Sequence, residues 1–196
     1  MARGSLRGVW LRGELPPGGF VWAANHHSWW DAFVALAVLE AHGREAGLLM
    51  DPANLARFGF LRGLGVLGTN ELRAGLREIR AGRALIVFPE GELRPPGALG
   101  PLGRGAGWLA RHAGSPLVAV AVRLALRGQQ AAEAYLDAAP ATPETLQTLL
   151  SARLAALDAE LLRADPRAPL AGFRRVLVGR SSWDERLERW GRLWPF

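Results

Sequence analysis

The stretch "FVWAANHHSWWDAFVALAVL", Phe20 to Leu39, joins a short apolar run, a polar cluster and a second apolar run. Phe20–Ala24 is typical of a buried strand, and it ends at two histidines. The pattern that follows predicts a helix over Trp29–Ala41, with Ser28 as its N-cap and Asp31 completing an S-x-x-D capping pattern. A strand, a polar turn and a helix are the unit from which α/β layered folds are built.

The rest of the chain continues this alternation. Further strands are predicted at Ala46–Met50, around Val66, and at Ala84–Phe88, Pro116–Leu124 and Ala134–Leu136. Further helices are predicted after Asp51-Pro52, over Leu72–Ile79 and Gly105–His112, and over Leu146–Leu161. We therefore predict an α/β fold for residues 1–196: one layered domain with a largely parallel or mixed central sheet flanked by helices, with its core over about 18–162 and a C-terminal extension over about 165–196.

Composition limits the classes of function. The chain has 196 residues, 49% of them hydrophobic, which predicts a globular domain with a sizeable core. The absence of cysteine excludes disulfides, thiolate metal sites and a cysteine nucleophile. The net charge is +6 and all 24 Lys and Arg positions are arginine, which favours phosphate-bearing partners. Nucleic acid is disfavoured, because the arginines are dispersed and no recognition motif is present.

The sequence also bears on membrane contact. The first residues, Met1 to Pro16, contain no long apolar stretch, and no segment reaches the roughly 18 apolar residues that a spanning helix needs. We expect neither a signal peptide nor a transmembrane helix. Trp183, Leu187, Trp190 and Trp194 form a helical stripe, with Arg186, Arg189 and Arg192 away from it. This pattern is typical of a short amphipathic interfacial helix, or of a helix whose stripe packs on its own domain.

The first candidate for chemistry is His26 with Asp31. The histidine follows a strand, and parallel sheets place reactive groups at the carboxyl ends of their strands. The carboxylate of Asp31 can orient one imidazole nitrogen and leave the other to accept a proton, as in a general base. An alternative is that Asp31 only caps the helix and His26 is a core residue. A metal site at His26, His27 and Asp31 is less favoured, because no second histidine pair is present.

The second candidate is "FPEGELR", Phe88 to Arg94. Glu90 directly follows a predicted buried strand, Gly91 allows a tight turn, and Arg94 can bind phosphate or carboxylate. Taken alone, this segment is also consistent with an ordinary turn.

Together the two motifs resemble the glycerophospholipid acyltransferase family, whose best-known members acylate lysophosphatidic acid. The N-H-x-x-x-x-D signature of that family, often with serine two residues after the histidine, is matched by Asn25, His26, Ser28 and Asp31. Its F-P-E-G signature is matched by Phe88, Pro89, Glu90 and Gly91. The segment Leu102 to Arg123 also looks like the helix and proline-started strand of the family. The resemblance covers about residues 18–162.

The resemblance implies a mechanism and its participants. His26, oriented by Asp31, would take the proton of an acceptor hydroxyl that attacks an acyl thioester of coenzyme A or acyl carrier protein. No metal or other cofactor is implied. The expected location is peripheral, at the cytoplasmic face of the cell membrane. The candidate substrate-binding residues are Asn25, Ser28, Glu90, Gly91, Arg94 and Arg73.

The sequence departs from the family pattern at three places. Asn70 and Glu71 stand where an arginine that holds the phosphate of the acceptor is expected, and Arg73 is only nearby. Glu92 and Leu93 replace the threonine and arginine that usually follow F-P-E-G. We also expect no counterpart of the N-terminal helical membrane anchor that is common in the family. The alternatives are therefore a non-phosphate lipid acceptor (glycolipid, ornithine lipid or pigment glycoside) or a lipid-binding member without turnover.

Overall fold

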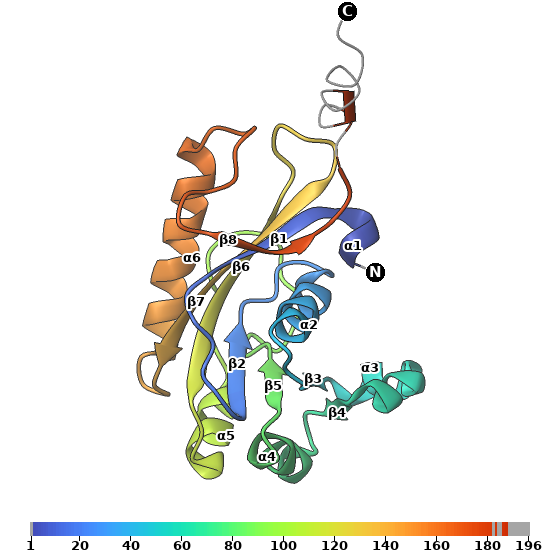
Figure 1. The fold of residues 1–196 in the computed structure, drawn as a ribbon. Coiled ribbons are helices and arrows are strands. Elements are labelled where there is room, and N and C mark those ends of the chain that lie inside the picture. Colours follow the sequence, from blue (N-terminus) through green and yellow to red (C-terminus); the bar gives the residue numbers. More distant parts are fainter. Residues whose placement is uncertain (1, 182, 184–185, 188–196) are drawn as a thin grey trace, which may run out of the picture.

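The protein is organised around one eight-stranded mixed sheet with helices on both faces (Figure 1). The strand order is β4-β3-β5-β2-β6-β7-β1-β8. β4, β3, β5, β2 and β6 are mutually parallel, β7 is antiparallel to β6, β1 is parallel to β7, and β8 is antiparallel to β1. The computed structural model describes residues 2–181, 183 and 186–187.

The described elements have the following bounds. The strands are β1 (Leu6–Arg12), β2 (Phe20–Ala24), β3 (Ala46–Met50), β4 (Val66–Gly68), β5 (Ala84–Val87), β6 (Leu117–Ala125), β7 (Ala132–Ala141) and β8 (Arg174–Val178). The helices are α1 (Ala2–Ser5), α2 (Asp31–Ala41), α3 (Pro52–Arg57), the 3-10 helix η1 (Gly59–Leu64), α4 (Leu72–Arg80), α5 (Gly105–Ala113) and α6 (Leu146–Arg163).

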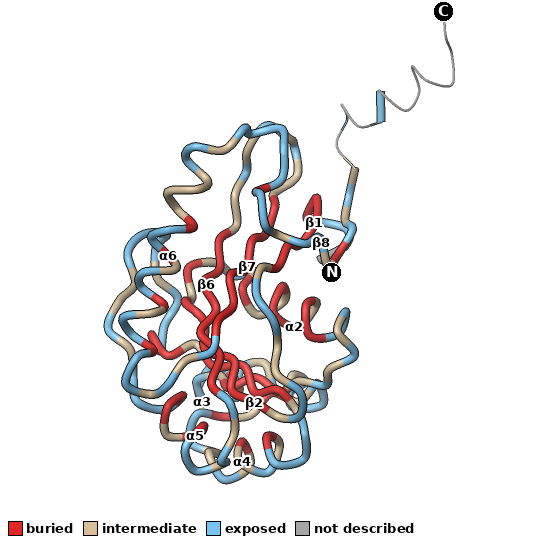
Figure 2. Tube along the Cα trace, turned by 60° about the vertical axis from the view of Figure 1, so that its left-hand side comes forward, coloured by how far each residue is buried: buried red, intermediate tan, exposed pale blue. Residues whose placement is uncertain are grey.

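Most of the sheet is buried on both faces (Figure 2), and its strands β2 and β5 are entirely apolar, as expected where neither face meets solvent. In β2, Trp22 packs into the core on the side of α2 and α3, whereas Val21 packs into the core on the side of α4, α5 and α6. On the second side, α6 contributes a stripe of buried leucines at helical spacing: Leu146, Leu150, Leu154 and Leu157. On the first side, α2, the helix that follows β2, is fixed against the sheet through the core that contains Trp22.

The α/β architecture and most of its elements agree with the sequence predictions. β2 and β3 have the predicted bounds, and Asp51 caps α3 by accepting the backbone N–H groups of Ala53 and Asn54. The predicted start of α2 was wrong, because the helix begins at Asp31 and not at Trp29. The Ser28 hydroxyl accepts the Trp30 N–H, at 3.2 Å, so Ser28 and the two tryptophans form a turn before the helix.

Two strands, β1 and β8, lie outside the range 18–162 and were not predicted from the sequence. β1 lies inside the sheet between β7 and β8, and β8 forms one edge. Arginines interrupt the apolar pattern of β1, but Arg7 pairs with the buried Glu133, and Arg12 pairs with Asp137 at 2.8 Å. Because both charges are compensated inside the fold, a strand that looks half-polar in sequence is largely buried.

The predicted C-terminal amphipathic helix lies mostly outside the described residues. Trp183 and Leu187 are described and are 56% and 58% exposed, whereas Trp190 and Trp194 lie outside the described part of the chain. Across the described residues, no helix combines the length and apolar character needed to span a bilayer.

The buried stripe of α6 gives a first testable prediction. Leu150→Ala should lower the free energy of unfolding by about 2–5 kcal/mol, because Leu150 is fully buried and truncation leaves a cavity. Leu162 lies on the same helix and is 87% exposed, so Leu162→Ala should change stability by less than about 0.5 kcal/mol. Urea unfolding of both variants checks the assignment, and equal losses would contradict the described packing of α6.

Candidate active site

The two sequence motifs meet at the carboxyl ends of neighbouring strands. β2 and β5 are parallel and paired, with Ala23 opposite Val87. His26 follows β2 and Glu90 follows β5, so both residues lie at one edge of the sheet. The parallel pairing thus brings His26 and Glu90 to neighbouring strand ends.

Asp31 holds the loop that carries His26. A single carboxylate oxygen, Oδ2, lies 3.1 Å from His26 Nδ1, 2.7 Å from the His27 N–H nitrogen and 2.8 Å from the Ser28 N–H nitrogen. Asp31 is 1% exposed. A carboxylate can only accept hydrogen bonds, so Nδ1 of His26 is the donor and Nε2 is the ring nitrogen that remains to take up or release a proton. Asp31 therefore orders the turn before α2 and also orients the imidazole.

The imidazole of His26 is held on a second side by an aromatic ring. It stacks on Phe88, with ring centroids 4.2 Å apart and an interplanar angle of 16°. The side chain remains 23% exposed. The ring is thus fixed by Phe88 and Asp31 while part of it still faces solvent, as a proton acceptor for an external group requires.

Glu90 is a buried acceptor, with a side chain that has no exposed surface. Its Oε1 accepts the His26 N–H at 2.9 Å, and its Oε2 accepts the Gly100 N–H at 2.9 Å. Burial alone would raise the pKa of Glu90, but these amide bonds and His27 outweigh it, so the pKa lies below its ordinary value. Glu90 is therefore ionised at neutral pH, and its oxygens accept hydrogen bonds from the protein backbone.

The segment after Glu90 returns to His26. The Arg94 N–H donates to the His26 carbonyl at 2.8 Å, so both polar groups of the His26 peptide are bonded to the F-P-E-G segment. The Arg94 side chain pairs with Glu92 at 2.7 Å and lies 3.8 Å from Glu90. It packs over Gly100, where a Cβ would come within 2.9 Å of the guanidinium carbon. Arg94 is thereby placed beside the candidate base.

Comparison with known proteins agrees with this geometry. Residues 11–123 match the model of the acyltransferase family. The chain belongs to the acyltransferase family. Its fold is similar to the crystal structure of the 1-acyl-sn-glycerophosphate (LPA) acyltransferase PlsC from Thermotoga maritima, with a TM-score of 0.57 and 18% identity, over 81% of this chain and 73% of that one. A comparison with curated protein sequences finds no match.

The other residues of the acyltransferase signatures have defined structural roles. Asn25 is fully buried, and its amide bonds both polar groups of Val122, at 2.7 and 3.1 Å, which ties the end of β2 to β6. Gly91 has φ +78, a conformation that favours glycine, and its N–H donates to Phe88 O at 3.0 Å in the turn. Asn25 and Gly91 thus shape the loops that carry His26 and Glu90.

The remaining candidate, Arg73, is not brought to His26. It is exposed on the first turn of α4, after β4, and β3 and β5 separate β4 from β2. Glu71 accepts the Gly68 N–H at 2.7 Å and pairs with Arg62 at 2.9 Å. The family resemblance led us to expect one phosphate-binding arginine in this region. Glu71 and its partner Arg62 from η1 lie there instead.

Two further residues lie at this site: His27, which the sequence suggested only as a less favoured metal ligand, and Arg123, which was not predicted. Arg123 follows the apolar run of β6 and is 7% exposed, and its guanidinium lies 2.7 Å from His27 Nδ1. The only signal in the sequence for Arg123 was an arginine at the end of an apolar strand, because a buried arginine requires partners.

Among the described residues, no group of three or more His, Cys, Asp or Glu side chains is arranged to hold a metal ion.

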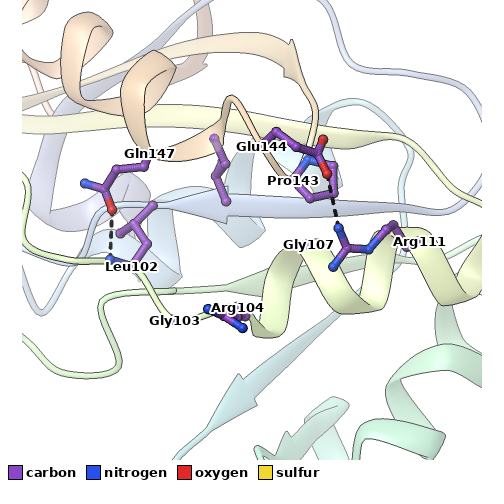
Figure 3. Close-up of a pocket in the computed structure, with 9 residues that line it drawn as sticks. Leu102, Gly103, Arg104, Gly107, Arg111, Pro143, Glu144 and Gln147 are labelled. Carbon is purple, nitrogen blue, oxygen red and sulfur yellow. Dashed lines mark hydrogen bonds and ion pairs between the residues drawn. The ribbon is translucent and has the colours of Figure 1, made fainter.

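A pocket of about 340 Å³ lies between α5 and the start of α6 (Figure 3). Its rim is tied by Leu102 N–H to Gln147, at 2.9 Å, and by Arg111 to Glu144, at 3.2 Å. The Gly103 N–H donates to Pro89 O at 2.7 Å, so the pocket borders the F-P-E-G segment. None of its lining residues belongs to the N-H-x-x-x-x-D motif.

The depressed pKa of Glu90 gives a second testable prediction. A carboxylate with a lower pKa in the folded state stabilises the fold above the unfolded pKa of about 4.3, and this contribution is lost as the pH falls through the folded pKa. Glu90→Gln should therefore lower the urea midpoint at pH 7, and the difference from wild type should shrink below about pH 4.

The neighbouring Glu92, whose side chain is 66% exposed, provides the control. Glu92→Gln should leave the midpoint close to that of wild type, because its ion pair with Arg94 is exposed to solvent. A Glu90→Gln difference that is the same at pH 7 and pH 3 would show that the charge of Glu90 does not stabilise the fold.

Proposed function

We propose that this protein is an O-acyltransferase that moves a fatty acyl group from a coenzyme A or acyl carrier protein thioester to a hydroxyl of a glycerolipid such as lysophosphatidic acid. The observation that carries this proposal is the 3.1 Å contact between His26 Nδ1 and the buried Asp31 carboxylate, because it orients the ring with Nε2 as the nitrogen that can take up a proton. Membership of the acyltransferase family supports the class of reaction. The similar fold of PlsC, the LPA acyltransferase of Thermotoga maritima, supports the kind of acceptor.

The reaction requires one base that also serves as the acid. Nε2 of His26 takes the proton of the acceptor hydroxyl while the oxygen attacks the thioester carbonyl carbon. The Asp31 carboxylate stabilises the imidazolium that forms. The tetrahedral intermediate then collapses, the C–S bond breaks, and the imidazolium returns the proton to the leaving thiolate. The products are the acylated acceptor and a free thiol, and no acyl-enzyme is formed.

Arg94 is the proposed contact for a phosphate of the acceptor or the donor. Its backbone is bonded to His26, and its guanidinium lies at the same edge of the sheet with a side chain that is 35% exposed. Arg62, paired with Glu71, is the alternative cation. The negative charge of Glu71 at this place favours, as a second candidate, a lipid acceptor without a phosphate.

The base assignment gives a third testable prediction. His26→Gln should lower kcat for acyl transfer by about 10²–10⁴-fold, the usual contribution of a general base, because glutamine cannot take up the proton. The assay is thiol release from an acyl thioester, measured with lysophosphatidic acid, a glycolipid, an ornithine lipid and a pigment glycoside in turn. Asp31→Asn should also lower kcat strongly.

The control is the same substitution at another histidine, His112→Gln, at the exposed end of α5, where Nδ1 contacts the Trp108 carbonyl at 2.8 Å. This variant should keep the kcat of wild type, because His112 belongs to neither motif. A His26→Gln enzyme that retains wild-type kcat with its best acceptor would rule out the proposed base.

We further propose that the enzyme acts peripherally at the cytoplasmic face of the cell membrane. Two large apolar side chains near the base support this: Trp29, 67% exposed, and Leu93, 52% exposed. Trp183 and Leu187 add exposed apolar surface beyond the core. Arg186 lies 5.4 Å from the Trp183 ring and would meet anionic headgroups.

A fourth testable prediction concerns this contact. Deleting residues 182–196 should weaken binding to vesicles that contain anionic lipid, because it removes the tryptophans and several arginines, each worth roughly 1 kcal/mol at such a surface. Co-sedimentation measures the loss, and added salt should weaken wild-type binding in part. Unchanged vesicle binding by the folded truncated protein would place the membrane contact elsewhere, with Trp29→Ser and Leu93→Ser as the next variants.

A further inference from the structure

The second histidine of the motif belongs to a chain of hydrogen bonds that starts on β6. Arg123 Nη1 lies 2.7 Å from His27 Nδ1, and His27 Nε2 lies 3.2 and 3.3 Å from the two carboxylate oxygens of Glu90. Glu90 accepts the backbone N–H of His26 at 2.9 Å. The His27 side chain is 3% exposed and that of Glu90 is not exposed. Buried contacts therefore connect the guanidinium of Arg123 to the peptide of the base.

The chemistry of the groups fixes the direction of each hydrogen bond. A guanidinium can only donate, so His27 Nδ1 is the acceptor and the ring proton lies on Nε2. That proton points to Glu90, which as a carboxylate can only accept. His26 has the opposite arrangement, with its proton on Nδ1. The two adjacent histidines thus hold opposite tautomers, each selected by a buried charged partner.

Arg123 is itself held rigidly. It pairs with Asp158 of α6 through Nη2 at 2.8 Å, and it donates to the Gly97 carbonyl at 2.6 Å. Gly97 belongs to the segment that runs from Glu90 to Gly100, and Gly100 also bonds Glu90. The network therefore connects β6, α6 and this segment to the loop that carries His26.

We propose that His27 and Arg123 are positioning residues of the acyltransferase: they hold the Glu90 carboxylate against the His26 peptide and thereby fix the place of the base. Glu90 is, in this proposal, a brace of the catalytic loop and not a contact of the acceptor, because its oxygens are occupied by His26, His27 and Gly100. The effect on turnover rests on the proposed function, whereas the effect on the His26 peptide does not.

The test uses two substitutions at one position. Glutamine can accept from Arg123 through its oxygen and donate to Glu90 through its nitrogen, whereas phenylalanine fills the space of the ring and can do neither. His27→Gln should keep kcat within about threefold of wild type, and His27→Phe should lose about 10²-fold, the scale expected when a catalytic group is misplaced by about 1 Å. KM should change little in both, because neither variant removes a substrate contact.

A measurement without substrate separates this inference from the proposed function. In ¹⁵N-resolved NMR spectra of the wild type, His27 should show an unprotonated Nδ1 and a protonated Nε2. The His26 amide resonance should keep its position in His27→Gln and move in His27→Phe, because its hydrogen bond to Glu90 is disturbed. Arg123→Gln, which retains a donor to His27, serves as a second variant if His27→Phe does not fold.

The outcomes are distinct. Wild-type kcat in folded His27→Phe, an equal loss in His27→Gln and His27→Phe, or a proton on His27 Nδ1 would each overturn the positioning role. A wild-type enzyme without acyl transfer to any acceptor would refute the proposed function. In that case the tautomer of His27 and the His26 amide resonance would still decide whether the two residues hold the loop.

Discussion

The candidate site depends on one buried charge, the carboxylate of Glu90. A carboxylate without solvent contact is costly unless donors surround it. Here the donors are the backbone N–H groups of His26 and Gly100 and the imidazole of His27. Satisfying this one group requires β2, β5 and the segment up to Gly100 to meet at one place. The parallel pairing of β2 with β5 provides that meeting point, since it brings both strand ends to the same edge.

The site separates two tasks between two carboxylates. Asp31 bonds the His26 ring and, with the N–H groups of His27 and Ser28, the turn before α2. Glu90 accepts a hydrogen bond from the His26 peptide N–H, whereas the ring of His26 is bonded by Asp31. The orientation of the imidazole and the position of its backbone are thus set independently. Charge-assisted hydrogen bonds of this kind keep a base in place before substrate binds, which lowers the reorganisation needed during the reaction.

Local patterns were sufficient to predict β2 and the start of α3, but not the start of α2. The apolar run of Phe20–Ala24 and the cap at Asp51 depend on neighbouring residues and were predicted correctly, whereas α2 begins at Asp31 and not at Trp29. The same logic failed for β1, where Arg7 is buried through an ion pair with Glu133, 126 positions away in the chain. A single sequence does not reveal such distant compensation.

The same limit applies within the site. His26 and Asp31 are five positions apart and could be paired from their spacing. His27 and Arg123 are separated by 96 positions, and only the fold shows that they touch. For Asp31, the sequence left open whether it bonds the turn or orients the imidazole. One oxygen atom makes both sets of contacts, because the turn that it bonds also carries His26.

In the proposed reaction, Nε2 of His26 is the atom that receives the proton of the acceptor. The most direct measurement is a crystal structure of the protein with a non-reactive acyl thioester analogue and a lipid acceptor. We expect the acceptor hydroxyl within about 2.6–3.2 Å of His26 Nε2, with the thioester carbonyl carbon next to that hydroxyl. An acceptor hydroxyl bound beyond the reach of His26, with its proton directed to another side chain, would exclude His26 as the base.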